Sequence, residues 1–166
     1  MFSKRAIPAC LLAVCLCSAA HVDAVQMVPL KGTWSGVTVS AVPIGPTLVS
    51  IVAEGSGQVS HLGQATMVSP HTSDIATGET IGEQIFTAAN GDMLTAHCEG
   101  TPVFAPDFSV VTGTLSCNIT GGTGRFAGAT GSYDFALVST LIPGPEIRFS
   151  TVAQITGSIS SVGSSK

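Results

Sequence analysis

Short runs rich in Val, Thr, Ile and Phe alternate along the chain with Gly, Pro and Asn, and no stretch keeps the period of an amphipathic helix. Such a pattern predicts β-strands joined by turns. We expect eight strands, at residues 33–42, 47–56, 58–69, 80–89, 92–99, 109–120, 130–142 and 146–160.

Apolar and polar residues alternate within several of these runs. In the strand at 109–120, Leu115, Cys117 and Ile119 point to one side, and the polar residues between them point to the other. One apolar and one polar face is typical of a half-exposed antiparallel sheet. Eight such strands with short turns favour an all-β fold, a closed eight-stranded antiparallel β-barrel, because closure leaves no unpaired edge.

The strands of a transmembrane barrel also alternate between apolar and polar residues, so the positions of the aromatic residues must distinguish the two kinds of barrel. A membrane barrel would carry aromatic girdles at both rims. This chain has one Trp, one Tyr and seven Phe, which do not gather at strand ends. We therefore expect a soluble barrel with an apolar interior.

The Asn90-Gly91 pair is the strongest hairpin signal, because both residues tolerate positive φ. A two-residue turn pairs residue 83 with 98 and turns Glu83 inwards. A three-residue turn with a bulge places Phe86 inside instead and leaves Glu83 outside. The second register packs more comfortably, but the pattern leaves both open. The segment 70–79 is expected to form a surface loop, and the alternative is that it lines the mouth of the barrel.

Residues 1–24 have the three parts of a secretory signal peptide: a positive start, an apolar run and small residues that allow cleavage after Ala20 or Ala24. A membrane anchor is the alternative, but the apolar run is too short to span a bilayer comfortably. We expect a secreted or periplasmic protein with no transmembrane segment in the mature chain. Its parts would be a short linker at 25–31, the barrel domain at 32–160 and a flexible tail at 161–166.

The charge balance excludes some partners. Removing Lys4, Arg5 and Asp23 with the signal peptide leaves four basic and nine acidic residues, a formal net charge of −5. Such a chain offers no basic patch to a phosphate backbone, so nucleic-acid binding is disfavoured.

Two cysteines, Cys98 and Cys117, remain after the signal peptide, on the apolar faces of strands that flank one loop. An even pair in an exported chain predicts a disulfide, and two buried free thiols are the alternative. No CxxC motif occurs and the histidines are scattered, so we expect no metal site and no cofactor.

The densest local motif is the glycine-rich segment 119–131. Gly122, Gly124 and Ala127 fit a dinucleotide-binding pattern, but that pattern requires a full helix after the turn. Glycines interrupt this segment within a few residues. We expect a tight strand exit, one helical turn whose Phe126 plugs an end of the barrel, and a new strand that starts at Gly131.

This segment resembles the motif of the allene oxide cyclase and dirigent proteins, which are eight-stranded antiparallel barrels with an apolar cavity. The matching residues are Ile119, Gly121, Gly122, Thr123, Gly124, Phe126, Ala129 and Gly131. The segment 57–63 is similar to one in exported bacterial proteins with this barrel. The resemblance implies a cavity that shapes an apolar substrate, with a few polar groups on its wall.

A small barrel is either filled by side chains or holds one small ligand. The wall of a ligand-binding lumen would come from inward apolar residues: Val37, Val39, Ile51, Val59, Leu94, Leu115, Phe135, Phe149 and Ile155. His61 and Tyr133 are in phase with inward residues and are candidates for proton transfer or ligand binding. The alternative, which we favour, is that each is a core residue whose polar tip forms a hydrogen bond with a backbone group. Glu83 is a candidate only in its inward register.

Three hypotheses follow for function. The leading one is an exported barrel that binds a small apolar molecule in its lumen. The second is a cofactor-independent cyclase, isomerase or dirigent-type enzyme acting on such a molecule, with no catalytic residue assigned. The third is a ligand-free barrel that acts through its outer surface, for example as a homo-oligomer, and it predicts a lumen packed solid by side chains.

Overall fold

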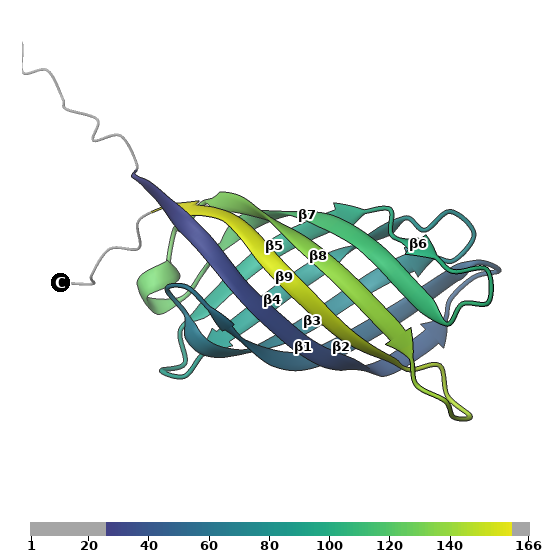
Figure 1. Ribbon diagram of the computed structural model, residues 1–166. Coiled ribbons are helices and arrows are strands. Elements are labelled where there is room, and N and C mark those ends of the chain that lie inside the picture. Colours follow the sequence, from purple (N-terminus) through teal and green to yellow (C-terminus); the bar gives the residue numbers. More distant parts are fainter. Residues whose placement is uncertain (1–25, 161–166) are drawn as a thin grey trace, which may run out of the picture.

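Antiparallel pairing runs all the way around the sheet in the computed structural model, which describes residues 26–160 (Figure 1). Each long strand pairs with its neighbour in sequence, β1 also pairs with β9, and β5 pairs with β7 to close the ring. The predicted closed eight-stranded antiparallel barrel is therefore confirmed. A two-residue strand, β6, adds to the edge of β7. The elements are β1 (Met27–Pro43), β2 (Leu48–Val59), β3 (Gly63–Asp74), β4 (Thr80–Ala88), β5 (Met93–Gly100), β6 (Val103–Phe104), β7 (Val110–Gly122), η1 (Gly124–Phe126), β8 (Gly131–Leu141) and β9 (Phe149–Ser160).

The two ends of the barrel differ in how they are closed (Figure 1). One end, which we call the η1 end, carries the short helix η1 and the hairpin turns after β2 and β4. The opposite end, which we call the loop end, carries the connections β1–β2, β3–β4, β5–β7 and β8–β9.

The glycine-rich segment closes the η1 end as the sequence predicts. One helical turn places Phe126 in the core with no exposed surface. Gly124 has a φ of 56°, and a Cβ there would overlap the carboxylate of Asp92. Gly131 starts β8 with a φ of 140°, where a Cβ would overlap the carbonyl oxygen of Ser158. The positive φ favours glycine at both places, and at Gly131 the backbone of β9 also leaves no space for a side chain.

The boundary between β2 and β3 lies later than predicted. β2 runs without a break through Gly55 and Gly57. Glycine is needed at both positions because the backbone of β1 lies where a side chain would be. The turn falls at 60–62, with His61 at a φ of 67°. β3 consequently extends to Asp74, so the first half of the segment expected as a loop at 70–79 is strand.

β1 starts at Met27, where it pairs with Ser160 of β9, so the barrel begins inside the segment assigned to a linker at 25–31. The signal peptide assigned to residues 1–24 and the tail assigned to 161–166 lie outside the described residues.

The inward face of β1 also differs from the prediction. Trp34 and Thr38 are buried and Gly36 lies between them on the same face, so Val37 points outwards. Val39 lies at a register shift between Thr38 and Ser40 and is 48% exposed. Neither valine lines the lumen. The prediction was wrong because it assigned the inward face to the apolar valines, whereas that face holds tryptophan, glycine and threonine.

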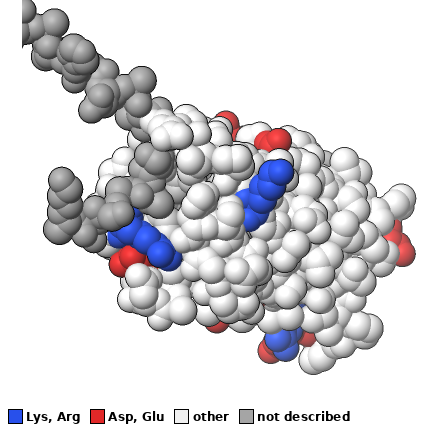
Figure 2. All heavy atoms as spheres, turned by 60° about the vertical axis from the view of Figure 1, so that its left-hand side comes forward, with Lys and Arg blue, Asp and Glu red and all other residues white. Residues whose placement is uncertain are grey.

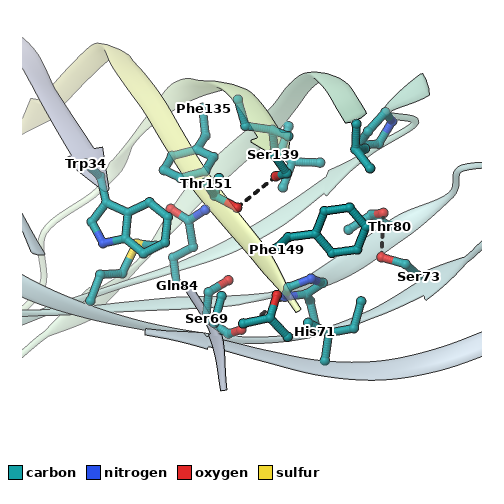
Figure 3. A pocket seen from close by; sticks show the side chains of 18 of the residues that line it. Trp34, Ser69, His71, Ser73, Thr80, Gln84, Phe135, Ser139, Phe149 and Thr151 are labelled. Atoms are coloured by element: carbon teal, nitrogen blue, oxygen red, sulfur yellow. Dashed lines mark hydrogen bonds between the residues drawn. The ribbon is translucent and has the colours of Figure 1, made fainter. Parts of the chain in front are cut away.

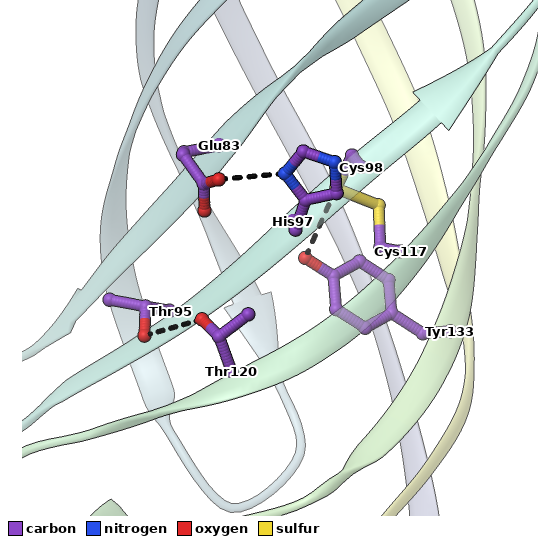
Figure 4. Close-up of polar contacts among 7 residues, drawn as sticks. All are labelled: Glu83, Thr95, His97, Cys98, Cys117, Thr120 and Tyr133. Atoms are coloured by element: carbon purple, nitrogen blue, oxygen red, sulfur yellow. Dashed lines mark hydrogen bonds and ion pairs between the residues drawn. A yellow bond between two sulfur atoms is a disulfide. The ribbon is translucent and has the colours of Figure 1, made fainter.

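The register around Asn90-Gly91 is the second of the two alternatives. Phe86 pairs with Leu94 inside the barrel, and Glu83 pairs with His97 on the outside. Cys98 and Cys117 face each other across β5 and β7 and form the predicted disulfide (Figure 4).

Charged side chains are sparse on the face that Figure 2 shows, which brings the η1 end towards the viewer, and some basic and acidic side chains lie beside each other. Within residues 26–160, no helix is long and apolar enough to cross a membrane. The exclusion of nucleic acid stays a prediction from the charge balance.

Candidate functional site

A cavity of about 110 Å³ occupies the half of the barrel nearest the loop end (Figure 3). The half nearest η1 is filled by side chains, among them Leu30, Phe86, Leu94 and Phe126, each at most 2% exposed. The cavity is lined by Trp34, Thr38, Ile51, Ala53, Met67, Ser69, His71, Ser73, Thr80, Gln84, Pro102, Phe104, Val111, Leu115, Phe135, Leu137, Ser139, Phe149 and Thr151.

Large apolar side chains form much of the cavity floor. Trp34 and Phe135 pack with their ring centroids 5.8 Å apart, and Met67 and Leu115 complete the layer. Trp34 fits here because Gly36 and Gly55 beside it have no side chains, and a Cβ on either would overlap the indole or the β1 backbone. The glycines of β1 and β2 therefore make room for the one tryptophan of the chain.

Gln84 brings an amide into this floor while being only 1% exposed. Its Oε1 accepts a hydrogen bond of 2.8 Å from the hydroxyl of Tyr133. Burial raises the pKa of Tyr133, and the Glu83 carboxylate adds to the rise, so the phenol stays protonated and donates. Tyr133 is not part of the cavity lining, and the amide nitrogen of Gln84 lies on the side of Thr151 and Phe135 (Figure 3).

His71 is the titratable side chain of the cavity wall. Its Nδ1 lies 3.0 Å from the carbonyl oxygen of Ser69, and because a carbonyl can only accept, Nδ1 carries the proton. Burial lowers the pKa of His71, and the hydrogen bond to Ser69 opposes this only in part. The imidazole is therefore neutral at pH 7, with an unprotonated Nε2. Gly82 pairs with His71 on β4, and a Cβ there would overlap the histidine.

Hydroxyl groups form the rest of the polar wall. Ser73 and Thr80 hydrogen-bond each other at 2.9 Å, and Ser139 and Thr151 do so at 2.8 Å (Figure 3). None of the lining residues is Asp, Glu, Lys or Arg. Among the described residues, no group of three or more potential metal ligands gathers.

The lumen residues predicted from the sequence divide into three groups. Ile51, Leu115, Phe135 and Phe149 line the cavity. Three others face inwards but belong to the solid half near η1: Val59, Leu94 and Ile155. Val37 and Val39 lie outside.

The three polar candidates are not in the cavity lining. His61 is exposed in the turn after β2, with its Nε2 3.0 Å from the carbonyl oxygen of Pro29, because β2 ends before it. Glu83 lies on the outer face, 2.7 Å from Nδ1 of His97 (Figure 4). Tyr133 points inwards as predicted, but it is sealed below Gln84.

The sequence pattern placed His71 in the 70–79 segment, for which a surface loop was favoured over a position lining the mouth of the barrel, and Gln84 was not among the candidates. Pro70 made the segment after residue 69 look like a loop, yet inward Ala65, Met67 and Ser69 continue in phase to His71. The ladder with β4 skips residues 69 and 70, which accommodates the missing N–H of proline. Extending the period of two through Pro70 would have found the histidine.

No protein-family model matches the chain, and no match was found among curated proteins. Among solved structures, the pterocarpan synthase dirigent protein GePTS1 aligns with a TM-score of 0.46 at 13% identity, covering 85% of this chain and 88% of that one. The assignment of the barrel rests on the strand pairing of this chain itself.

Proposed function

We propose that this protein binds a small, largely apolar molecule in the cavity at the loop end of its barrel. The observation that carries the proposal is the cavity itself, about 110 Å³ within an otherwise packed lumen. Protein interiors are normally filled to the density of organic crystals, so a void of this size in a barrel this small is a specific feature.

The size of the cavity indicates the size of the ligand. An apolar cavity of about 150 Å³ takes up benzene. The cavity here is somewhat smaller, so it suits a molecule with no more than about one ring. The aromatic floor of Trp34 and Phe135 offers such a ring a stacking surface.

The same observation weighs against a barrel that acts only through its surface. That hypothesis predicts a lumen packed solid from end to end. Packing is solid only near η1, where Phe126 and the Cys98–Cys117 disulfide lie.

The single tryptophan makes the proposal testable without a label. Trp34 lies on the cavity floor, so nitrobenzene, a neutral contact quencher, should quench its fluorescence saturably. Ala53→Phe fills the cavity and should remove the saturable part. Ala136→Phe makes the same change at an exposed position on β8 and should leave quenching intact. Quenching that never saturates in the unchanged protein, or that Ala53→Phe leaves unaltered, would contradict ligand binding.

One observation favours a second function, cofactor-independent isomerisation or cyclisation. His71 places a neutral Nε2 in a cavity, which is what a general base needs. The test is deuterium exchange of cyclohexanone in D₂O. Nε2 would take the proton next to the carbonyl, and the enolate would then accept a deuteron derived from solvent. Catalysed exchange that falls roughly 100-fold in His71→Gln, but not in the surface variant His97→Gln, would support it. Exchange at the buffer rate would exclude this base activity.

We also propose that the protein is exported. A disulfide such as Cys98–Cys117 persists in oxidising compartments, which fits the signal peptide read from residues 1–24. N-terminal sequencing of secreted material should begin at His21 or Val25. Secreted material that still begins at Met1 would contradict cleavage.

A further inference from the structure

The cavity presents one hydrogen-bond acceptor and one donor whose directions are fixed by the protein. Ser69 holds the proton of His71 on Nδ1 and leaves Nε2 as the acceptor. Tyr133 occupies the oxygen of Gln84 and leaves the amide nitrogen as the donor. His71 pairs with Gly82 across β3 and β4, and Gln84 lies two residues farther along β4, so His71 and Gln84 are diagonal neighbours on the inner face.

Four hydroxyl groups of the wall are engaged with one another in two pairs. Ser73 is paired with Thr80, and Ser139 with Thr151, so each pair already makes one hydrogen bond. The hydroxyls of Thr38 and Ser69 also line the wall and can either donate or accept. The free Nε2 of His71 can only accept and the amide nitrogen of Gln84 can only donate, so these two groups set the direction of a ligand's hydrogen bonds.

Charge sets the second condition on the ligand. No lining residue is acidic or basic, and His71 is neutral at pH 7. A carboxylate or an ammonium in this cavity would lose its water without meeting an opposite charge, and burying an unpaired charge is costly.

We infer that the cavity selects an uncharged molecule that carries a hydroxyl group, and that this hydroxyl donates a hydrogen bond to Nε2 of His71. The inference rests on the proposed function and names the ligand class for the same cavity. The apolar part of the molecule would lie against Trp34 and Phe135, and Gln84 would donate to a second oxygen or to the same hydroxyl.

Four probes of similar size separate these requirements: ethylbenzene, benzyl alcohol, benzoate and benzylamine. At about pH 8, benzoate is an anion, benzylamine is mostly a cation and His71 is neutral. Affinities are measured by displacement of nitrobenzene from Trp34. Benzyl alcohol and ethylbenzene have nearly the same shape, so the ratio of their affinities reports the hydroxyl. Benzoate and benzylamine should bind at least about tenfold more weakly than benzyl alcohol.

Variants then assign the hydroxyl contact to one side chain. His71→Phe keeps a ring but removes the acceptor, so the affinity ratio of alcohol to ethylbenzene should fall roughly 2- to 10-fold, the equivalent of one hydrogen bond. His71→Gln restores an acceptor and should recover part of the ratio. His97→Phe makes the matched change on the outer face and should leave the ratio unaltered.

The outcomes distinguish this inference from the proposed function. If ethylbenzene binds but His71→Phe leaves the ratio unchanged, or if benzoate binds as well as the alcohol, the inference is wrong and apolar binding stands. If no probe displaces nitrobenzene, the inference and the proposed function both fail. Ethylbenzene binding in each variant confirms that the variant is folded.

Discussion

At the scale of single residues, His71 links the stability of the barrel to pH. The unfolded imidazole takes up a proton near its ordinary pKa of 6.5, whereas burial lowers the pKa in the folded protein. Between these two values the unfolded state binds more protons, so the free energy of unfolding falls as the pH decreases through this window. Urea unfolding at a series of pH values below 7 should show the loss, and His71→Gln should make it shallower. An equally steep loss in the variant would contradict this assignment.

The Tyr133–Gln84 pair gives a second prediction at this scale. Tyr133→Phe leaves the buried Oε1 of Gln84 without its donor, which should lower the free energy of unfolding by about 1–3 kcal/mol. Gln84→Met in the same chain removes the orphaned oxygen. The double variant should therefore be less destabilised than the sum of the two single variants, by about 0.5–3 kcal/mol. Strict additivity in urea unfolding would show that the two side chains do not act together.

At the scale of strands, alternation in the sequence predicts the elements well where the inward side chains are apolar. In β7, inward Leu115, Cys117 and Ile119 alternate with exposed polar residues, and the predicted face is the observed one. In β1 the alternation of apolar and polar residues predicts the wrong inward face, because the inward positions hold Trp34, Gly36 and Thr38. A glycine that makes room for a tryptophan carries no hydrophobic signal, so the outward valines looked like the core.

The glycines under Trp34 yield a prediction for this element. A Cβ on Gly55 would overlap the carbonyl oxygen of Ser35 and press on the indole. Gly55→Ala should therefore destabilise the barrel by about 1–3 kcal/mol, as overpacking does. Gly144→Ala is the matched control, because nothing lies within 4 Å of the added methyl group. Thermal unfolding of the two variants measures the difference, and equal melting temperatures would refute the role given to Gly55.

At the scale of the whole molecule, the barrel is solid near η1 and hollow near the loops. Alternation predicts which residues face inwards, but not whether they fill the lumen, because that depends on which side chains meet across it. Trp34 meets Phe135, and Tyr133 meets Gln84, from strands far apart in the sequence. The sequence pattern therefore could not predict the cavity, although it correctly predicted four of the apolar residues that line it.

This asymmetry predicts a gradient of local stability along single strands. Local opening is rarer where apolar packing is dense, and the disulfide adds a further constraint in the solid half. In hydrogen exchange, strand amides on the η1 side of Leu115 in β7 and of Phe135 in β8 should be protected at least about tenfold more than those on the loop side, or ~1.4 kcal/mol in opening free energy. Saturating ethylbenzene should raise protection mainly on the loop side, because a ligand in the cavity stabilises only states in which the cavity is formed. Equal protection along both strands would mean that the barrel opens as one unit, and a ligand effect confined to the η1 side would place the binding site elsewhere.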